Sequence, residues 1–276
     1  MGKKRSKIRL LIQALFAALS NGYIKGFAHG KIFKGSTKYL CVPGLNCYSC
    51  PGALGSCPIG ALQATLNSRE YKISLYVIGF LVVVGTVLGR FVCGFLCPFG
   101  LVQDLLFKIP FIKKIRTLPG EKFLRYFRFV ILAIFVILLP MVIVDFTGLG
   151  DPWFCKYICP AGTLEGGIPL VLLNESMRSA IGFLYNWKIA ILIFTILVSI
   201  IIYRPFCRYI CPLGAIYGIF NKISIYRYHI DTEKCTECGA CQKNCKLNIK
   251  VYQNPNSIDC IRCGECKDIC PNKAIK

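Results

Sequence analysis

PFCRYICPLG (residues 205–214) is the most informative stretch of this chain, because its pattern recurs in FVCGFLCPFG (91–100) and WFCKYICPAG (153–162). Each copy holds an aromatic residue, a CxxxCP motif and a glycine two residues after the proline. CPIG (57–60) is a variant fourth copy, in which Ala53 stands where the first cysteine would be. Cysteines four residues apart share one face of a helical turn, and the proline that follows favours the end of that helix. Two such turns together would offer four thiolates to a metal centre.

Long apolar runs lie between these copies and indicate a membrane protein. Hydrophobic residues make up 55% of the 276 residues, whereas only 17% are charged. The first candidate span is the weakest, because it contains Asn21 and Lys25 and would also suit an interfacial helix. The last is shorter and is flanked by Trp187 and Lys188 as interface anchors. The sequence predicts an α-helical membrane protein with about four transmembrane helices, at residues 10–27, 73–92, 126–146 and 189–203.

The formal net charge of +21 fits a membrane protein better than a nucleic-acid-binding one. Lysine and arginine lie mainly between the apolar runs and in the leader KKRSKIR, as the positive-inside rule describes. With the leader inside, the basic loop at 108–125 and the tail after Arg204 also lie inside, and residues 147–186 lie outside. The outer segment with Lys31, Lys34, Lys38, Arg69 and Lys72 fits less well. We therefore expect a multi-pass cell-membrane protein with both termini in the cytoplasm, in contact with lipid and with no nucleic acid.

Past Tyr226 the apolar runs end, which divides the chain into a membrane domain (1–225) and a C-terminal domain (226–276). The tail contains CTECGACQKNC (235–245) and CIRCGECKDICP (260–271), both with the spacing C-x2-C-x2-C-x3-C. This run ligates two 4Fe-4S clusters, and each fourth cysteine crosses to the other cluster. We expect a small α+β two-cluster ferredoxin-like domain. Its ligands are Cys235, Cys238, Cys241 and Cys270 for one cluster, and Cys245, Cys260, Cys263 and Cys266 for the other.

The order of spans, the CxxxCP motifs and the two-cluster ferredoxin tail together resemble the NapH-like family of membrane iron-sulfur proteins, which has related modules in NosR and CcoG. The resemblance covers nearly the whole chain past the first span. It implies that two CxxxCP motifs face the cytoplasm, and that electrons pass between the quinone pool and redox partners outside. The matching cysteines are Cys93, Cys97, Cys207 and Cys211, which we expect to share one inner 4Fe-4S cluster.

The chain departs from that pattern on the outer side, where it adds further cysteines. Alternating copies would place the variant and third copies outside, so Cys155 and Cys159 must meet cysteines of the first outer segment. Cys57 is expected there because it holds the second-cysteine position of the variant copy. Cys50 is the expected fourth ligand, since it is the other Cys-Pro of that segment.

The remaining outer cysteines, Cys41 and Cys47, would be spare or would belong to a second outer centre. A rival arrangement closes one outer cluster within residues 41–57 alone and leaves the 155/159 pair for another metal or a disulfide. Zinc would accept the same four sulfurs, and a lone CxxxCP could simply be buried, inert cysteine. The repeated motifs favour 4Fe-4S clusters, and disulfides are an alternative only outside the C-terminal domain.

Other cofactors find less support in the sequence. Haem between spans needs axial histidines, and the chain offers only His29 and His229, so we expect no haem. Quinone binding stays open. Asp145 and Asp151 flank the end of the third span, where they would pass quinol protons or simply be interfacial acids that meet water or an arginine. The sequence contains neither GxGxxG nor a P-loop motif, which leaves nucleotide binding without support.

Two classes of function follow from these patterns. The first is an electron-transfer subunit of a membrane oxidoreductase, with a quinol dehydrogenase role as one form. It would link a cytoplasmic donor or the quinone pool with an extracytoplasmic partner such as a flavoprotein. The second is a metal-handling or thiol redox-sensing protein that uses the outer cysteines. The tandem ferredoxin motif favours the first class, because clusters at both faces would carry electrons across an insulating layer of ~30 Å.

Overall fold

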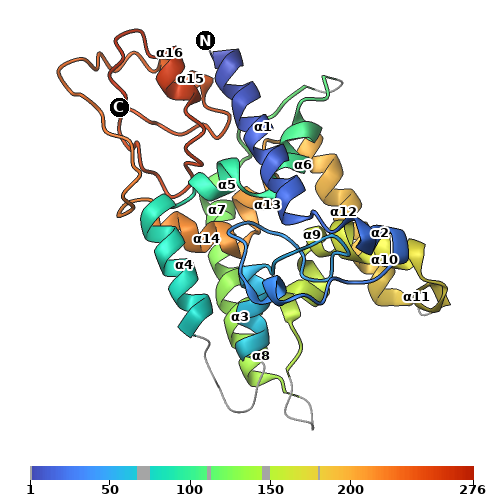
Figure 1. The fold of residues 1–276 in the computed structure, drawn as a ribbon. Helices are drawn as coiled ribbons and strands as arrows, with labels where there is room; N and C mark the ends of the chain where they lie inside the picture. The colour runs from blue at the N-terminus through green and yellow to red at the C-terminus, as the bar shows by residue number, and fades with distance from the viewer. Residues whose placement is uncertain (1, 67–74, 111–112, 145–149, 180) are drawn as a thin grey trace.

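The structure is a computed structural model that describes residues 2–66, 75–110, 113–144, 150–179 and 181–276. Helices make up most of it, and its described parts contain no β-strand beyond isolated bridges. The C-terminal segment lies at one end of the helices, beside the start of α1 (Gly2–Ser20) (Figure 1). Both ends of the chain therefore lie at the same end of the molecule.

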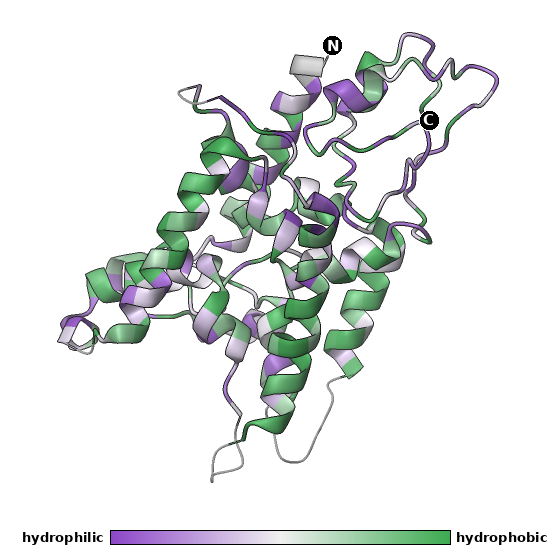
Figure 2. Cartoon of the chain, turned by 180° about the vertical axis from the view of Figure 1, so that it is seen from behind, coloured by the Kyte–Doolittle hydropathy of each residue, from purple (hydrophilic) through white to green (hydrophobic). Residues whose placement is uncertain are grey.

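Among the described residues, two helices are long and apolar enough to cross a membrane. One is the continuous stretch Glu121–Val142, with 22 residues and a mean hydropathy of 2.1. It consists of α7 (Glu121–Ile131), π-helical turns over Leu132–Leu138 and α8 (Leu139–Val142). The other is α12 (Phe183–Ile201), with 19 residues and a mean hydropathy of 2.0. Figure 2 shows the long helices as mainly hydrophobic and the C-terminal segment as more hydrophilic, so the helices suit a lipid surrounding.

The first expected span, at 10–27, is wrong as a continuous helix. Helix α1 ends, and a separate short helix, α2 (Ile24–His29), follows it after a break. Arg9 and Gln13 are buried on α1, and Arg9 pairs with Asp104 at 3.2 Å. Averaged hydropathy concealed these two residues, whose burial shows that one face of α1 packs against protein, while Leu11, Leu15 and Leu19 are exposed.

The second expected span is present in part. Helix α4 (Leu75–Leu88) has 14 described residues, fewer than the about 20 that cross a bilayer. Ile73 lies outside the described residues, as do Asp145 and Phe146 at the end of the third expected span. By length and composition, the described structure thus supports two membrane helices rather than four.

Each CP motif begins a new helix. Proline suits the first helical position, where its missing N–H is no loss and its fixed φ is already helical. The expected end of the helix at the proline is confirmed, because new helices start there: α3 (Pro58–Leu66), α6 (Pro98–Phe107), α9 (Pro160–Gly162) and α14 (Pro212–Phe220). The first cysteine of each full copy lies on a short turn before that start, in α5 (Phe91–Phe95), α13 (Pro205–Tyr209) or the π-helical turn Phe154–Ile158. Further short turns are a 3-10 turn at Ser36–Tyr39, a π-helical turn at Thr163–Gly167, α10 (Ile168–Leu173) and α11 (Glu175–Ser179).

Residues 226–276 are all described and are mainly loop. They contain two short helices, α15 (Ala240–Asn244) and α16 (Glu265–Ile269). Ile230 and Ile275 form one antiparallel bridge, but no sheet forms in this segment. The expected α+β fold is therefore corrected to a helical and irregular one, because the closely spaced cysteine loops leave no run of extended residues long enough to pair.

Candidate iron-sulfur sites

Two hollows in the C-terminal segment each bring four cysteines together. The first is lined by Cys235, Cys238, Cys241 and Cys270, and the second by Cys245, Cys260, Cys263 and Cys266. These are the two sets that the crossed spacing predicts. Gly239 and Gly264, with φ of 70° and 79°, turn the chain between the second and third cysteine of each run. A side chain would strain this left-handed backbone, so glycine lets each set close around its hollow.

The four cysteines expected to share the inner cluster, called the inner set below, also meet. Cys93 and Cys97 come from the break between α5 and α6, and Cys207 and Cys211 from the break between α13 and α14. All four are buried, and their thiols lie within electrostatic reach of one another. Gln103 donates a hydrogen bond from Nε2 to the Cys207 sulfur at 3.0 Å. Such a donor stabilises the thiolate, which is the form that ligates metal.

Two buried arginines connect the two halves of this inner set. Arg90 donates from Nη2 to the carbonyl oxygen of Cys207 at 2.9 Å. Arg204 donates from Nη1 to the carbonyl oxygen of Cys93. Asp104 accepts from Arg204 through both carboxylate oxygens, at 2.7 and 2.6 Å, so the buried guanidinium is paired.

The glycine repeated in each copy makes room for these arginines. A Cβ on Gly100 would lie 3.3 Å from Nη1 of Arg204, and a Cβ on Gly214 would lie 3.1 Å from Nη2 of Arg90. The same Cβ atoms would lie 3.1 Å from the carbonyl oxygens that the two arginines contact. The motif glycine is therefore a packing requirement of the paired copies.

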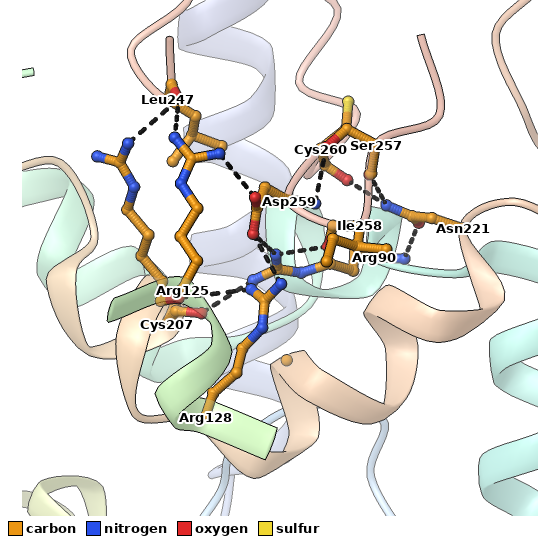
Figure 3. Close-up of polar contacts among 12 residues, drawn as sticks. Arg90, Arg125, Arg128, Cys207, Asn221, Leu247, Ser257, Ile258, Asp259 and Cys260 are labelled. Atoms are coloured by element: carbon orange, nitrogen blue, oxygen red, sulfur yellow. Dashed lines mark hydrogen bonds and ion pairs between the residues drawn. The ribbon is translucent and has the colours of Figure 1, made fainter. Parts of the chain in front are cut away.

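The loop that carries Cys260 packs directly onto the inner set. A Cβ on Gly94 would lie only 2.4 Å from the carbonyl oxygen of Ile261, so this approach requires glycine. Arg90 reinforces the contact, because it also donates from Nη1 to the carbonyl oxygen of Ile258 at 2.9 Å (Figure 3). The C-terminal segment thus touches the inner set through backbone.

Asp259 draws three arginines onto the same loop (Figure 3). Its carboxylate lies 2.7 Å from Arg125 and from Arg128, both on α7, and 3.6 Å from Arg90. Burial raises the pKa of Asp259, but the three guanidinium groups outweigh burial and hold that pKa below its usual value. The carboxylate therefore remains ionised and fixes the C-terminal segment to the membrane domain.

A separate cavity of about 360 Å³ lies between residues 45–60 and the third copy. We call it the outer cavity, after the side on which its cysteines are expected. The cysteines that line it are Cys47, Cys57, Cys155 and Cys159. Gln63 donates from Nε2 to the Cys155 sulfur at 3.4 Å, and Lys188 donates to the carbonyl oxygen of Cys155 at 3.1 Å. The cavity thus brings two cysteines of residues 41–57 to the pair from the third copy.

The lining differs from the expected outer set at one position. Cys47 lines the cavity in place of Cys50, and neither Cys50 nor Cys41 is among its described lining residues. A turn runs from Cys47 to Cys50, whose N–H donates to the Cys47 carbonyl oxygen at 3.0 Å. Of the two cysteines in this turn, Cys47 is the one among the described lining residues, whereas the Cys-Pro dipeptide at 50–51 had favoured Cys50. The rival set confined to 41–57 also differs from this lining.

Sequence reasoning missed a set of polar residues six positions after the second cysteine of each copy. They are Gln63, Gln103, Glu165 and Tyr217. Both glutamines donate to the sulfur of the first cysteine in the copy they face, and Glu165 accepts the N–H of Cys47 at 2.7 Å. Extending the alignment of the copies three residues past the glycine would have found them.

Each set contains four cysteines, which is the number of thiolates that a 4Fe-4S centre takes and that zinc would also accept. In the described ranges of the chain, no group of three His, Cys, Asp or Glu side chains stands at the distances of a single-ion site. The C-terminal and outer sets each surround a hollow.

The other residues considered from the sequence lie apart from these sets or serve ordinary roles. His29 and His229 are both exposed. Asp151 lines the outer cavity and pairs with Lys156. Asp145 lies outside the described residues.

Comparison with protein families matches three stretches of the chain to a 4Fe-4S binding domain, at residues 73–119, 132–168 and 187–227. Two further 4Fe-4S binding domains match residues 226–247 and 256–276. These stretches contain the three full CxxxCP copies and both ferredoxin runs. Residues 41–60, with the variant copy, lie outside them.

Among curated proteins, the chain is 30% identical over 201 residues to the uncharacterized proteins MJ0749 and MJ0750 of Methanocaldococcus jannaschii. The alignments cover 70% and 71% of this chain, and 66% and 74% of those proteins, so the chain spans about two thirds of the first. The ferredoxin-type protein NapH of Haemophilus influenzae is 26% identical over 193 residues, which cover 49% of this chain and 65% of NapH. Similarity also extends to the ferredoxin-type protein MauN and to NosR, which confirms the resemblance seen in the sequence. No solved structure matches the chain.

Proposed function

This chain belongs to the same family as MJ0750 and contains 4Fe-4S binding domains, and we propose that it transfers electrons across a membrane. Its 4Fe-4S motifs make it an electron-transport protein of the ferredoxin type, and its apolar helices and its NapH relative support membrane association. The route of the electrons is part of the proposal. The chain links a cytoplasmic donor or the quinone pool with an extracytoplasmic redox partner such as a flavoprotein.

The observation that carries the proposal is the contact between Gly94 and Ile261. Ile261 lies between Cys260 and Cys263 of one ferredoxin set, and Gly94 directly follows Cys93 of the inner set. Each 4Fe-4S cluster, when bound, would supply a carrier for one electron. The chain therefore holds two ligand sets against each other through adjoining backbone, which is the arrangement that rapid electron transfer requires.

The orientation rests on charge. Arg116 donates to the carbonyl oxygen of Lys243, and Arg125 pairs with Asp259, so the basic loop at 108–125 contacts the C-terminal segment. Arg5 also reaches this segment, through Asp268 at 3.2 Å. The positive-inside rule assigns such a basic end to the cytoplasm, together with both termini.

The proposal includes four membrane crossings, of which the first is not one helix. In Figure 1 the chain starts beside the C-terminal segment, and α3 and α8 lie toward the opposite end. The first crossing then consists of α1, the irregular segment 21–57 and α3. Helix α4, the stretch Glu121–Val142 and helix α12 make the other three.

Quinone binding finds support in an apolar hollow of about 260 Å³ beside the fourth copy. Phe206, Tyr209 and Ile210 line it, and each lies within two residues of Cys207 or Cys211 in the sequence. The Tyr209 hydroxyl is buried and has no hydrogen-bond partner among the described residues. It could therefore donate to a quinone carbonyl next to the inner set.

Proteoliposomes that enclose ferricyanide test the electron-transfer function. Dithionite added outside should reduce the enclosed ferricyanide at least tenfold faster with the protein than without it. Cys97→Ala should return the rate to that of protein-free liposomes, and its intact ferredoxin EPR signals would show that the variant is folded. A wild-type rate equal to that of empty liposomes would contradict the proposal.

The outer cavity favours metal handling as a second candidate function. Four cysteines around about 360 Å³ could hold copper or zinc in transit rather than a resident cluster. Metal analysis of protein purified without oxygen separates the two functions. Exchangeable copper or zinc, with no liposome electron transfer, would favour metal handling.

A further inference from the structure

The outer cavity has the components of a cluster site that the family comparison does not cover. Cys155 and Cys159 lie in a matched stretch, whereas Cys47 and Cys57 lie in a segment that no family model matches. We propose that these four cysteines hold a second membrane-domain 4Fe-4S cluster, and that the backbone of residues 44–46 connects it to the inner set. The site stands on its own geometry, and the connection rests on the proposed function.

The ligand set follows from the likeness between the outer and inner sites. In the inner site Gln103 donates to the sulfur of the first cysteine of the fourth copy. In the outer site Gln63, at the same position of its copy, donates to the sulfur of the first cysteine of the third copy. Three ligands of the outer site are thus placed as in the inner one. The variant copy lacks the fourth, because Ala53 replaces it, and Cys47 lines the cavity instead.

Two contacts fix Cys47 at the cavity. Its N–H donates to Oε2 of Glu165 at 2.7 Å, and Glu165 belongs to the third copy. A Cβ on Gly162, in the same copy, would lie 3.7 Å from the Cys47 sulfur, so this thiol packs against the CxxxCP turn. Cys47 thereby joins the third copy, although Cys155 lies 108 positions later in the chain.

Asn46 is an independent sign of a ligand in the cavity. Its side chain lines the cavity and is 0% exposed, yet neither its amide nitrogen nor its amide oxygen has a hydrogen-bond partner among the described residues. Leaving such groups unpaired in a dry interior is costly, because each loses its hydrogen bonds to water without a replacement. Cluster sulfides and cysteine sulfurs would accept from the amide nitrogen.

The same short segment connects the two membrane sites. Gly44 packs against Cys97 of the inner set, and the next two residues, Leu45 and Asn46, line the outer cavity together with Cys57. Neighbouring residues thus contact the inner set and the outer set. The outer ligands therefore do not lie a full hydrocarbon layer of ~30 Å from the inner ones.

Packing holds this segment against the inner motif. A Cβ on Gly44 would lie 2.9 Å from Cα of Cys97 and 2.9 Å from the carbonyl oxygen of Leu96. The buried Tyr217 hydroxyl donates to the carbonyl oxygen of Pro43 at 3.1 Å. Both contacts reach the segment from the inner copies.

Iron and sulfide analysis of the full-length protein, purified without oxygen, tests the site. Cys47→Ala and Cys155→Ala should each lose about four iron atoms per chain and the same EPR signal. Cys50→Ala, a matched buried cysteine of the same turn, should retain both. Cys47→Ser serves as a second variant if Cys47→Ala does not fold, and it should also change that signal.

Three results would overturn the site. The first is loss of iron in Cys50→Ala with full iron in Cys47→Ala. The second is loss of different EPR signals in Cys47→Ala and Cys155→Ala. The third is zinc or copper in place of iron at wild-type cysteines. These measurements do not depend on electron transfer, so the site can be right even if the liposome assay fails.

EPR of the reduced wild-type protein tests the connection. Two paramagnetic centres that contact the same short segment should broaden each other's signals, and Cys155→Ala should sharpen the remaining inner signal. An inner signal of unchanged width in Cys155→Ala would overturn the connection and leave the site intact. Cys50→Ala should keep the wild-type width.

Discussion

Arg90 and Arg204 occupy the same position in their copies, three residues before the first cysteine, and each donates to the carbonyl oxygen of the first cysteine in the other copy. This reciprocal relation gives the inner site an approximate two-fold symmetry. The same relation explains why a glycine recurs in the motif, since each arginine crosses the glycine of the opposite copy.

Arg204→Lys should remove the inner EPR signal and leave the two ferredoxin signals. A lysine cannot contact the Cys93 carbonyl and both oxygens of Asp104 together, because it lacks the planar fork of donors. Breaking such a buried pair costs about 3–5 kcal/mol. EPR and thermal unfolding check the result, with exposed Arg227→Lys as the matched control. An unchanged inner signal in Arg204→Lys would show that the contacts of Arg204 with Asp104 and with the Cys93 carbonyl are not needed for the inner cluster.

Gln103→Leu should lower the reduction potential of the inner cluster, and Gln63→Leu should lower that of the outer cluster. Each glutamine donates to a cysteine sulfur, and such a donor favours the reduced, more negative cluster. A hydrogen bond worth about 1 kcal/mol corresponds to a shift of a few tens of mV. Redox titration followed by EPR should show the inner potential change only in Gln103→Leu and the outer potential only in Gln63→Leu. A shift of the same signal in both variants would contradict the separate sites.

Asp259→Asn should loosen the C-terminal segment from the membrane domain. The neutral amide leaves Arg90, Arg125 and Arg128 without their shared anion, at a cost of about 3 kcal/mol or more. Hydrogen exchange should increase at residues 226–276 while the iron content stays unchanged. Asp231→Asn is the control, because its pairs with Lys234 and Lys276 lie at the surface and contribute little. Equal protection in both variants would argue against this role.

Gly94→Ala should slow electron transfer in the liposome assay without loss of iron. The new methyl group would meet the Ile261 carbonyl oxygen, so the two backbones must separate. Gly79→Ala is the matched control, since a Cβ there meets nothing within 4 Å and alanine favours its helix. A Gly94→Ala rate equal to that of Gly79→Ala would remove this contact from the route.

The cysteine sets of the C-terminal segment and of the inner site could be predicted because they depend on spacing within short motifs. The structure brings Cys235 and Cys270 together, and Cys93 and Cys207, as expected. The fourth outer cysteine could not be predicted in this way. Whether Cys47 or Cys50 reaches the cavity depends on the path of an irregular loop, which motif spacing does not determine.

The course of the first helix was also beyond the sequence pattern. Leu10 and its apolar neighbours suggest a span, but the buried Arg9 on the same helix finds its partner in Asp104, far along the chain. Long-range pairing of this kind is invisible to a hydropathy average. The boundary expected near residue 226 stays a prediction.

The contact of the first helix with the last has a consequence for biosynthesis. Arg5 donates to the carbonyl oxygen of Gly264, 259 residues later, within the second cysteine run. A ribosome synthesises Arg5 long before Gly264. This contact therefore cannot form until residues 5–264, with all four CP motifs, have been translated.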